Sequence, residues 1–129
     1  MILLDTHVLL WRMLEPERLS ADAAEAIAGA DPRAISAITF QEAAYLVARG
    51  RVDLFKPVGS WFADALGAIE AMALPATASI ALRAGSLDPQ EFRGDPMDRL
   101  IYATAVEHDA RLVTADERLR SFDPERTVW

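Results

Sequence analysis

Acidic residues that follow apolar segments are the main chemical signal of this sequence. Asp5 comes directly after the apolar run Ile2–Leu4, at the expected carboxyl end of a strand. Other acids follow a short apolar run or stand at the start of an expected helix: Glu42, Asp95, Asp98 and Asp116. Carboxylate oxygens select Mg²⁺ or Mn²⁺ over zinc, and divalent ions held in this way mostly support phosphoryl or phosphodiester chemistry. The sequence therefore raises the hypothesis of a metal-dependent phosphodiesterase.

The elements that must position these acids alternate between short apolar runs and longer helical patterns. Strands are expected at residues 2–4, 34–36, 72–74, 112–113 and 127–129. Helices are expected at residues 6–14, 21–28, 39–50, 58–71, 77–84, 96–108 and 115–120. Short strands without polar alternation are typical of a parallel sheet that helices cover on both faces. The pattern predicts one α/β domain over residues 1–129, a three-layer α/β/α sandwich with a short central parallel sheet.

The predicted topology brings the acids to one edge of the sheet. In an open parallel sheet, the carboxyl ends of the strands and the first turns of the following helices share one edge, where ligands usually bind. All five acids are therefore expected on that edge. Asp5 is the hardest of them to explain as a surface residue, because an acid directly after a strongly apolar strand lies beside the core.

Each of the other acids has an ordinary structural explanation. Asp95 is a candidate N-cap and Asp98 complements the dipole of the same helix. Thr39 and Glu42 have the spacing of a capping box, and Asp116 is a candidate cap of the last helix. Capping alone would account for any one of these acids, so only their combination points to a functional site.

Composition narrows the classes of protein that fit. The chain has 129 residues, 52% of them hydrophobic, and a formal net charge of −7. That balance argues against binding of duplex nucleic acid through a basic surface, although a metal-dependent nuclease remains compatible with it. Cysteine is absent, which excludes disulfides and thiolate metal sites. No membrane span or secretory signal is expected, so we expect a cytoplasmic protein.

Four segments resemble PIN-domain ribonuclease toxins of the VapC type, the toxin half of VapBC toxin–antitoxin pairs. They are ILLDTHVLLW at 2–11, the stretch 36–51, GDPMDRLI with the following ATA at 94–105, and LVTADERL at 112–119. Each segment alone is a weak signal, whereas four in this order and at this chain length are specific. Residues 53–88 carry no motif of the family.

The resemblance implies an endoribonuclease that depends on Mg²⁺ or Mn²⁺ and cleaves RNA with a metal-activated water. The acidic catalytic residues of the family map onto Asp5, Glu42, Asp98 and Asp116. Asp5 and Asp98, with Asp116, would hold one or two ions, and Glu42 would bind metal or orient the attacking water. Three further residues would contact these acids and orient them: Asp95, Thr6 and Thr114.

The resemblance also implies partners. Toxins of this type form homodimers and are inhibited by a VapB antitoxin, which supplies the DNA-binding half of the pair. The toxin itself would meet RNA as its substrate, DNA only through the antitoxin, and no membrane. Apolar residues on two helices near the acids are the expected antitoxin groove: Leu9, Leu10, Trp11, Leu46 and Val47.

Three other interpretations compete with the toxin. An aspartyl-phosphate phosphatase also places an aspartate after a strand, but it requires a second acid where this chain has His7. A noncatalytic binding module whose acids only cap helices, and a free-standing PIN-domain nuclease, both remain open. His7 and His108 are discounted as general bases, since both are expected along helices and away from the acidic edge.

Overall fold

A five-stranded parallel sheet forms the centre of the computed structural model, which describes residues 1–129. The strands are β1 (Ile2–Leu4), β2 (Arg33–Ser36), β3 (Ala71–Leu74), β4 (Arg111–Val113) and β5 (Thr127–Val128). Their order across the sheet is β3-β2-β1-β4-β5, and every neighbouring pair is parallel. The predicted short parallel sheet is therefore confirmed.

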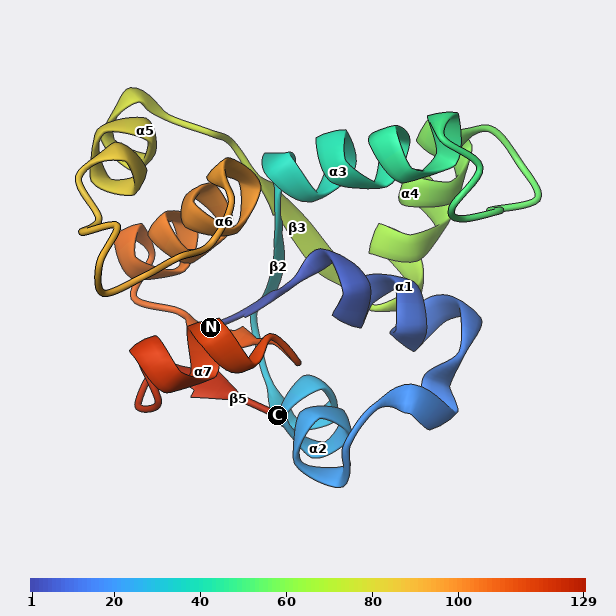
Figure 1. The fold of residues 1–129 in the computed structure, drawn as a ribbon. Coiled ribbons are helices and arrows are strands. Elements are labelled where there is room, and N and C mark those ends of the chain that lie inside the picture. Colours follow the sequence, from blue (N-terminus) through green and yellow to red (C-terminus); the bar gives the residue numbers. More distant parts are fainter.

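Helices connect the strands and cover both faces of the sheet (Figure 1). They are α1 (Thr6–Leu14), α2 (Ala21–Gly29), α3 (Ala37–Ala48), α4 (Val58–Ala68), α5 (Ala78–Gly85), α6 (Pro96–Glu107) and α7 (Glu117–Phe122), with a short 3-10 turn at Pro16–Arg18. In Figure 1, α1, α2 and α4 lie on one side of the sheet, and α5, α6 and α7 lie on the other. None of these helices has the length and apolar character needed to cross a membrane.

The central strand β1 shows why the sheet needs helices on both faces. Ile2 and Leu4 pack into one hydrophobic cluster with residues of α1, α2, α3 and α4, whereas Leu3 packs into a second cluster with residues of α6 and α7. Side chains of a strand point alternately to its two faces, so three consecutive apolar residues supply both cores. This arrangement is the predicted three-layer α/β/α sandwich.

The outer strand β3 departs from the expected burial on both faces. Met72 is 46% exposed and Ala73 is also exposed, while Leu74 is buried. The strand lies at the edge of the sheet, where only β2 pairs with it. An apolar run therefore predicted this strand correctly but overestimated its burial, because the sequence does not show which strand is outermost.

Helix α3 begins earlier than expected, and this changes the interpretation of Glu42. Ser36 is the N-cap, and its hydroxyl oxygen accepts a hydrogen bond from the backbone N–H of Ile38 at 3.2 Å. Thr39 is buried inside the helix, and Glu42 lies in the second turn rather than the first. The predicted Thr39–Glu42 capping box is wrong, because β2 passes directly into the helix and the serine is the polar group nearest its free N–H groups.

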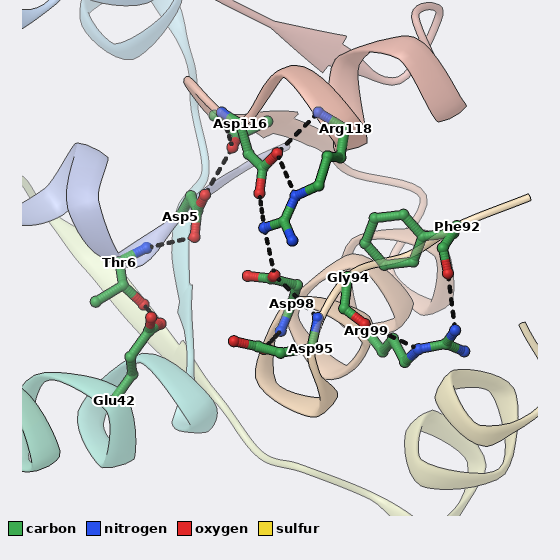
Figure 2. Close-up of polar contacts among 11 residues, drawn as sticks. Asp5, Thr6, Glu42, Phe92, Gly94, Asp95, Asp98, Arg99, Asp116 and Arg118 are labelled. Atoms are coloured by element: carbon green, nitrogen blue, oxygen red, sulfur yellow. Dashed lines mark hydrogen bonds and ion pairs between the residues drawn. The ribbon is translucent and has the colours of Figure 1, made fainter. Parts of the chain in front are cut away.

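A single arginine organises the segment 86–95 between α5 and α6, which we call the α5–α6 corner. The Arg99 guanidinium donates a hydrogen bond to the carbonyl oxygen of Leu87 at 2.8 Å. It also donates to those of Phe92 at 2.8 Å and Gly94 at 3.3 Å (Figure 2). The Phe92 ring is buried beneath this segment. These contacts fix the start of α6, where Asp95 and Asp98 lie.

Candidate functional site

The carboxylate of Asp5 lies at the carboxyl end of the central strand and is almost completely buried, with 8% of the residue exposed. One oxygen, Oδ1, accepts a hydrogen bond from the backbone N–H of Thr6 at 2.7 Å and so caps α1. The other, Oδ2, accepts one from the hydroxyl of Thr114 at 2.6 Å. Both oxygens are thereby oriented by Thr6 and Thr114, the two threonines predicted to support the acids.

Thr6 connects Asp5 with Glu42, which lies on a different helix. Its backbone N–H binds Asp5, and its hydroxyl donates to the Glu42 carboxylate (Figure 2). The second-turn position of Glu42 on α3 points this side chain back toward the end of β1. Glu42 therefore lies at the acidic edge because of its position in the second turn of α3, and not because it caps that helix as predicted.

The acids at the starts of α6 and α7 do cap their helices. The backbone N–H of Asp98 donates to Asp95 Oδ1 at 2.9 Å, and that of Asp95 donates to Asp98 Oδ2 at 3.3 Å, which forms a reciprocal capping box. Asp116 caps α7 and accepts from the backbone N–H of Arg118 at 2.8 Å. The capping predictions for these three acids are confirmed, and the caps direct their carboxylates to the same edge as Asp5.

The Arg118 guanidinium lies between two of these acids and was not predicted from the sequence. Its Nη2 atom is 3.0 Å from Asp98 Oδ2 and 2.6 Å from Asp116 Oδ2, and its Nε atom is 3.1 Å from Asp116 Oδ1 (Figure 2). The spacing of two residues could have indicated the contact with Asp116, since both stand at the start of one helix. Asp98 lies on a different helix, α6, so no local pattern of the sequence indicates its contact with Arg118.

Burial and crowding give the acids unequal proton affinities. Burial is the main cause that raises the pKa values of Asp5 and Glu42. Burial, followed by the negative charges of Asp95 and Asp5, raises the pKa of Asp98 to about 6. The hydrogen bond from Arg118 instead lowers the pKa of Asp116. Burial and the neighbouring acids therefore disfavour the charged forms of Asp5, Glu42 and Asp98, whereas the charged form of Asp116 is favoured.

The chemistry of the donor set fits a hard divalent cation. The side chains are carboxylates and threonine hydroxyls, and one arginine is the only basic residue that forms ion pairs with them. A divalent cation prefers such oxygen ligands and would favour the charged forms of the carboxylates that it contacts. In this conformation no three acidic or histidine side chains converge closely enough to hold one ion, and Arg118 lies between two of the candidates.

A hollow of about 1040 Å³ adjoins the acids at Glu42 and Asp95 and extends along α1 and α3. The predicted groove residues Leu10, Trp11 and Leu46 line it, as do the following: His7, Leu14, Glu15, Arg18, Tyr45, Arg51, Val52, Asp53, Phe55, Pro96 and Met97. The hollow thus connects an apolar surface with the acidic edge.

Two predicted groove residues and one histidine lie elsewhere than expected. Leu9 is completely buried in the core and Val47 packs against that core, because neighbouring residues of a helix point in different directions. His7 is exposed in the first turn of α1 and lines the hollow beside Glu42, so its expected position away from the edge is wrong. His108 ends α6 and lies away from the acids, as expected.

Comparisons with known proteins agree with this architecture. The family model described as "PIN domain" matches residues 2–124. Ribonuclease VapC22 of Mycobacterium tuberculosis is 47% identical over 130 residues, which cover 99% of this chain and 98% of that protein.

Solved structures with low sequence identity share the fold. One is a toxin–antitoxin complex from Klebsiella pneumoniae, with a TM-score of 0.68, 21% identity, and coverage of 100% of this chain and 97% of that one. Another is VapBC2 from Rickettsia felis bound to a DNA fragment from its promoter, with a TM-score of 0.73, 19% identity, and coverage of 99% and 98%.

Proposed function

Because the chain belongs to the PIN-domain family, and within it to the VapC ribonucleases, we propose that it is a toxin that cleaves RNA in a metal-dependent reaction. One observation carries the metal-dependent chemistry. Acids that follow β1 and β4 and acids of the helices α3 and α6 lie along one edge, where Arg118 forms ion pairs with Asp98 and Asp116. Helix capping accounts for Asp5, Asp95, Asp98 and Asp116. It does not account for Glu42, which lies in the second turn of α3 and caps no helix.

The chain's own residues would hold the ion and orient the reactants. Asp5 and Asp98 would bind Mg²⁺ or Mn²⁺, and Asp116 would complete the set. When bound, such an ion lowers the pKa of water and stabilises negative charge on the phosphate. Glu42 would orient the attacking water or take up its proton. It is half-buried and accepts a hydrogen bond from the hydroxyl of Thr6, whose backbone N–H binds Asp5, so Glu42 is held near Asp5.

The hydroxyl groups near the acids would act on the carboxylates and not on RNA. Thr114 donates to Asp5 and accepts from the backbone N–H of Asp116 at 3.1 Å, so it joins two of the acids. A water nucleophile requires no 2′-hydroxyl of the substrate. The products should accordingly carry a 5′-phosphate and a 3′-hydroxyl.

Cleavage of single-stranded RNA by purified protein tests the proposal. We expect Asp98→Asn to reduce the cleavage rate by about 100-fold or more, since interactions that stabilise developing charge have effects of this size. Asp22→Asn is the matched control, because Asp22 is an exposed first-turn acid of α2, away from the edge. Undiminished cleavage in excess EDTA, or by Asp98→Asn, would contradict the metal-dependent mechanism.

We further propose that the hollow beside the acids receives an antitoxin segment. Leu10 and Leu46 are buried in the core and form only the floor of the hollow. Its more accessible apolar residues, Trp11, Leu14, Tyr45 and Phe55, would supply most of the affinity, because aromatic and aliphatic anchors dominate interfaces. Glu42 and Asp95, where the hollow meets the acidic edge, favour an arginine or lysine of the partner at that end.

Co-expression with the small protein of a neighbouring reading frame tests the partner. We expect the co-expressed partner to abolish RNA cleavage. We expect a partner that lacks its carboxyl-terminal tail to leave cleavage uninhibited. Full inhibition by the truncated form, or the absence of any small copurifying partner, would favour a free-standing PIN-domain nuclease.

The toxin has an oligomeric state, a cellular location and an RNA target that the comparisons leave open. The homodimer stays a prediction, which light scattering of the purified chain would test. We propose a cytoplasmic protein that meets transfer RNA or a ribosomal RNA loop, since exposed single-stranded bases are the readable part of RNA. DNA would be bound only by the antitoxin. Sequencing of RNA 5′ ends after induced expression would identify the substrate.

A further inference from the structure

We propose that Arg118 is a built-in counter-cation, which closes the acidic edge and must leave Asp98 and Asp116 when a divalent ion binds there. This inference rests on the proposed metal-dependent function. It adds a competition between the chain's own guanidinium and the metal for the same carboxylates.

The guanidinium of Arg118 lies between two carboxylates. One nitrogen of Arg118, Nη2, contacts an oxygen of Asp98 and an oxygen of Asp116. Those two carboxylates come from different helices, so the guanidinium occupies the space between them (Figure 2). An ion ligated through the carboxylate oxygens that face each other, Asp98 Oδ2 and Asp116 Oδ2, would compete with the guanidinium for both of them.

The side chain of Arg118 is free to move away from the two carboxylates. Its side chain is 53% exposed, and its guanidinium donates only to the carboxylates of Asp98 and Asp116. It therefore has no backbone acceptor that would keep it in place. Because the guanidinium is half-exposed, water can replace the hydrogen bonds that Arg118 loses, which lowers the cost of breaking the contact even though Asp98 and Asp116 are mostly buried.

The Arg118 side chain also has open space on its outer side. Arg118 also lines a separate hollow of about 410 Å³ with Phe92, Arg93, Ser121 and Phe122, among others. Two acids, Glu91 and Glu117, line the same hollow. A displaced guanidinium would therefore find open space and compensating negative charge there.

Competition of this kind is a coupling between two cations and must be reciprocal: the ion weakens the arginine contact, and the arginine weakens binding of the ion. Removal of the guanidinium should consequently increase the affinity for metal. The expected gain is about fivefold or more, the lower end of typical couplings between sites.

Titration calorimetry with Mn²⁺ on EDTA-stripped protein measures this gain. The variants are Arg118→Ala and Arg118→Gln, the second as a safeguard for folding. Arg120→Ala is the matched control, because it removes one positive charge from the same helix and Arg120 forms no ion pair. We expect tighter Mn²⁺ binding in both Arg118 variants than in the Arg120→Ala control.

A second measurement follows Arg118 itself in the wild-type chain. The ¹⁵N signal of its Nε–H group, assigned with Arg118→Lys, should shift during titration with diamagnetic Mg²⁺ as the contact with Asp116 breaks. An unchanged signal at saturating Mg²⁺ would overturn the proposal, as would equal Mn²⁺ affinities of the Arg118→Ala and Arg120→Ala variants. If neither the wild type nor these variants bind Mn²⁺, the metal-dependent function itself fails, and the competition fails with it.

Discussion

Two arginines lie on either side of the start of α6, and they differ in what accepts their hydrogen bonds. Arg99 holds the α5–α6 corner through carbonyl oxygens of Leu87, Phe92 and Gly94. Arg118 at the acidic edge donates to the carboxylates of Asp98 and Asp116 instead. The same guanidinium group is therefore used in two different ways within one short region (Figure 2).

The difference shows how a rigid scaffold can carry an adaptable site. Backbone carbonyls that have no other partner lose a charge-assisted hydrogen bond if Arg99 leaves, and nothing else replaces it. Carboxylates can exchange one cation for another with little net change in charge compensation. The α5–α6 corner should thus depend on its arginine for stability, while the acidic edge should tolerate the loss of its own.

Replacement of Arg99 should have the largest effect on stability. We expect Arg99→Ala to lower the free energy of unfolding by about 2 to 4 kcal/mol, because several partly buried carbonyls lose a charged donor. Urea denaturation of metal-free protein measures this. Arg118→Ala should cost less than about 1 kcal/mol in the same experiment. Equal losses in the two variants would remove the distinction between the two regions.

A methyl group at Gly94 should disturb the α5–α6 corner to a smaller extent. A Cβ there would lie 2.1 Å from Cζ of the Phe92 ring, which is only 1% exposed and cannot easily move. We expect Gly94→Ala to cost about 1 to 3 kcal/mol, the usual range for overpacking.

Gly59 in α4 provides the control for this substitution. Nothing lies within 4 Å of a Cβ at that position, so Gly59→Ala should be neutral or stabilising by up to about 1 kcal/mol. If thermal unfolding shows Gly94→Ala to be as stable as Gly59→Ala, the ring beneath the corner is more mobile than its burial indicates.

The acidic edge should lower stability at neutral pH through Asp98. Burial and the nearby acids raise the pKa of Asp98 to about 6, from an ordinary 3.8. The folded state then binds this proton more tightly than the unfolded chain, so the associated stability is complete below about 3.8 and is lost as the pH rises through about 6. The sign is opposite to that of a carboxylate stabilised by a salt bridge.

Asp98→Asn should remove this pH dependence. Between pH values of about 5 and about 7.5, we expect metal-free wild type to lose about 1 kcal/mol more stability than the variant. At the higher pH the variant should melt at the wild-type temperature or up to about 4 °C above it. A clear drop in melting temperature would instead mean that Asp98 acts chiefly as a helix cap.

Local patterns predicted most of the elements that surround the site. The sequence Gly94-Asp95-Pro96 indicated the start of α6 correctly, since the cap and the proline act within a few residues. The start of α3 was wrong by two residues, because both Ser36 and Thr39 are suitable caps and only the end of β2 decides between them. Where two nearby residues have similar capping propensity, the end of the preceding strand determines which of them caps the helix.

The chemistry of the edge follows from the sequence by itself, whereas its present arrangement depends on the tertiary structure. Apolar strands followed by Asp5 and Asp116, and caps at the start of α6, place acids at one edge of any parallel sheet built from this chain, because strand ends and helix starts share that edge. Arg118 contacts Asp98 across 20 residues of sequence, and Thr6 contacts Glu42 across 36. Such contacts depend on how two helices pack, which no local pattern encodes, so only the folded chain shows which cation lies among the acids.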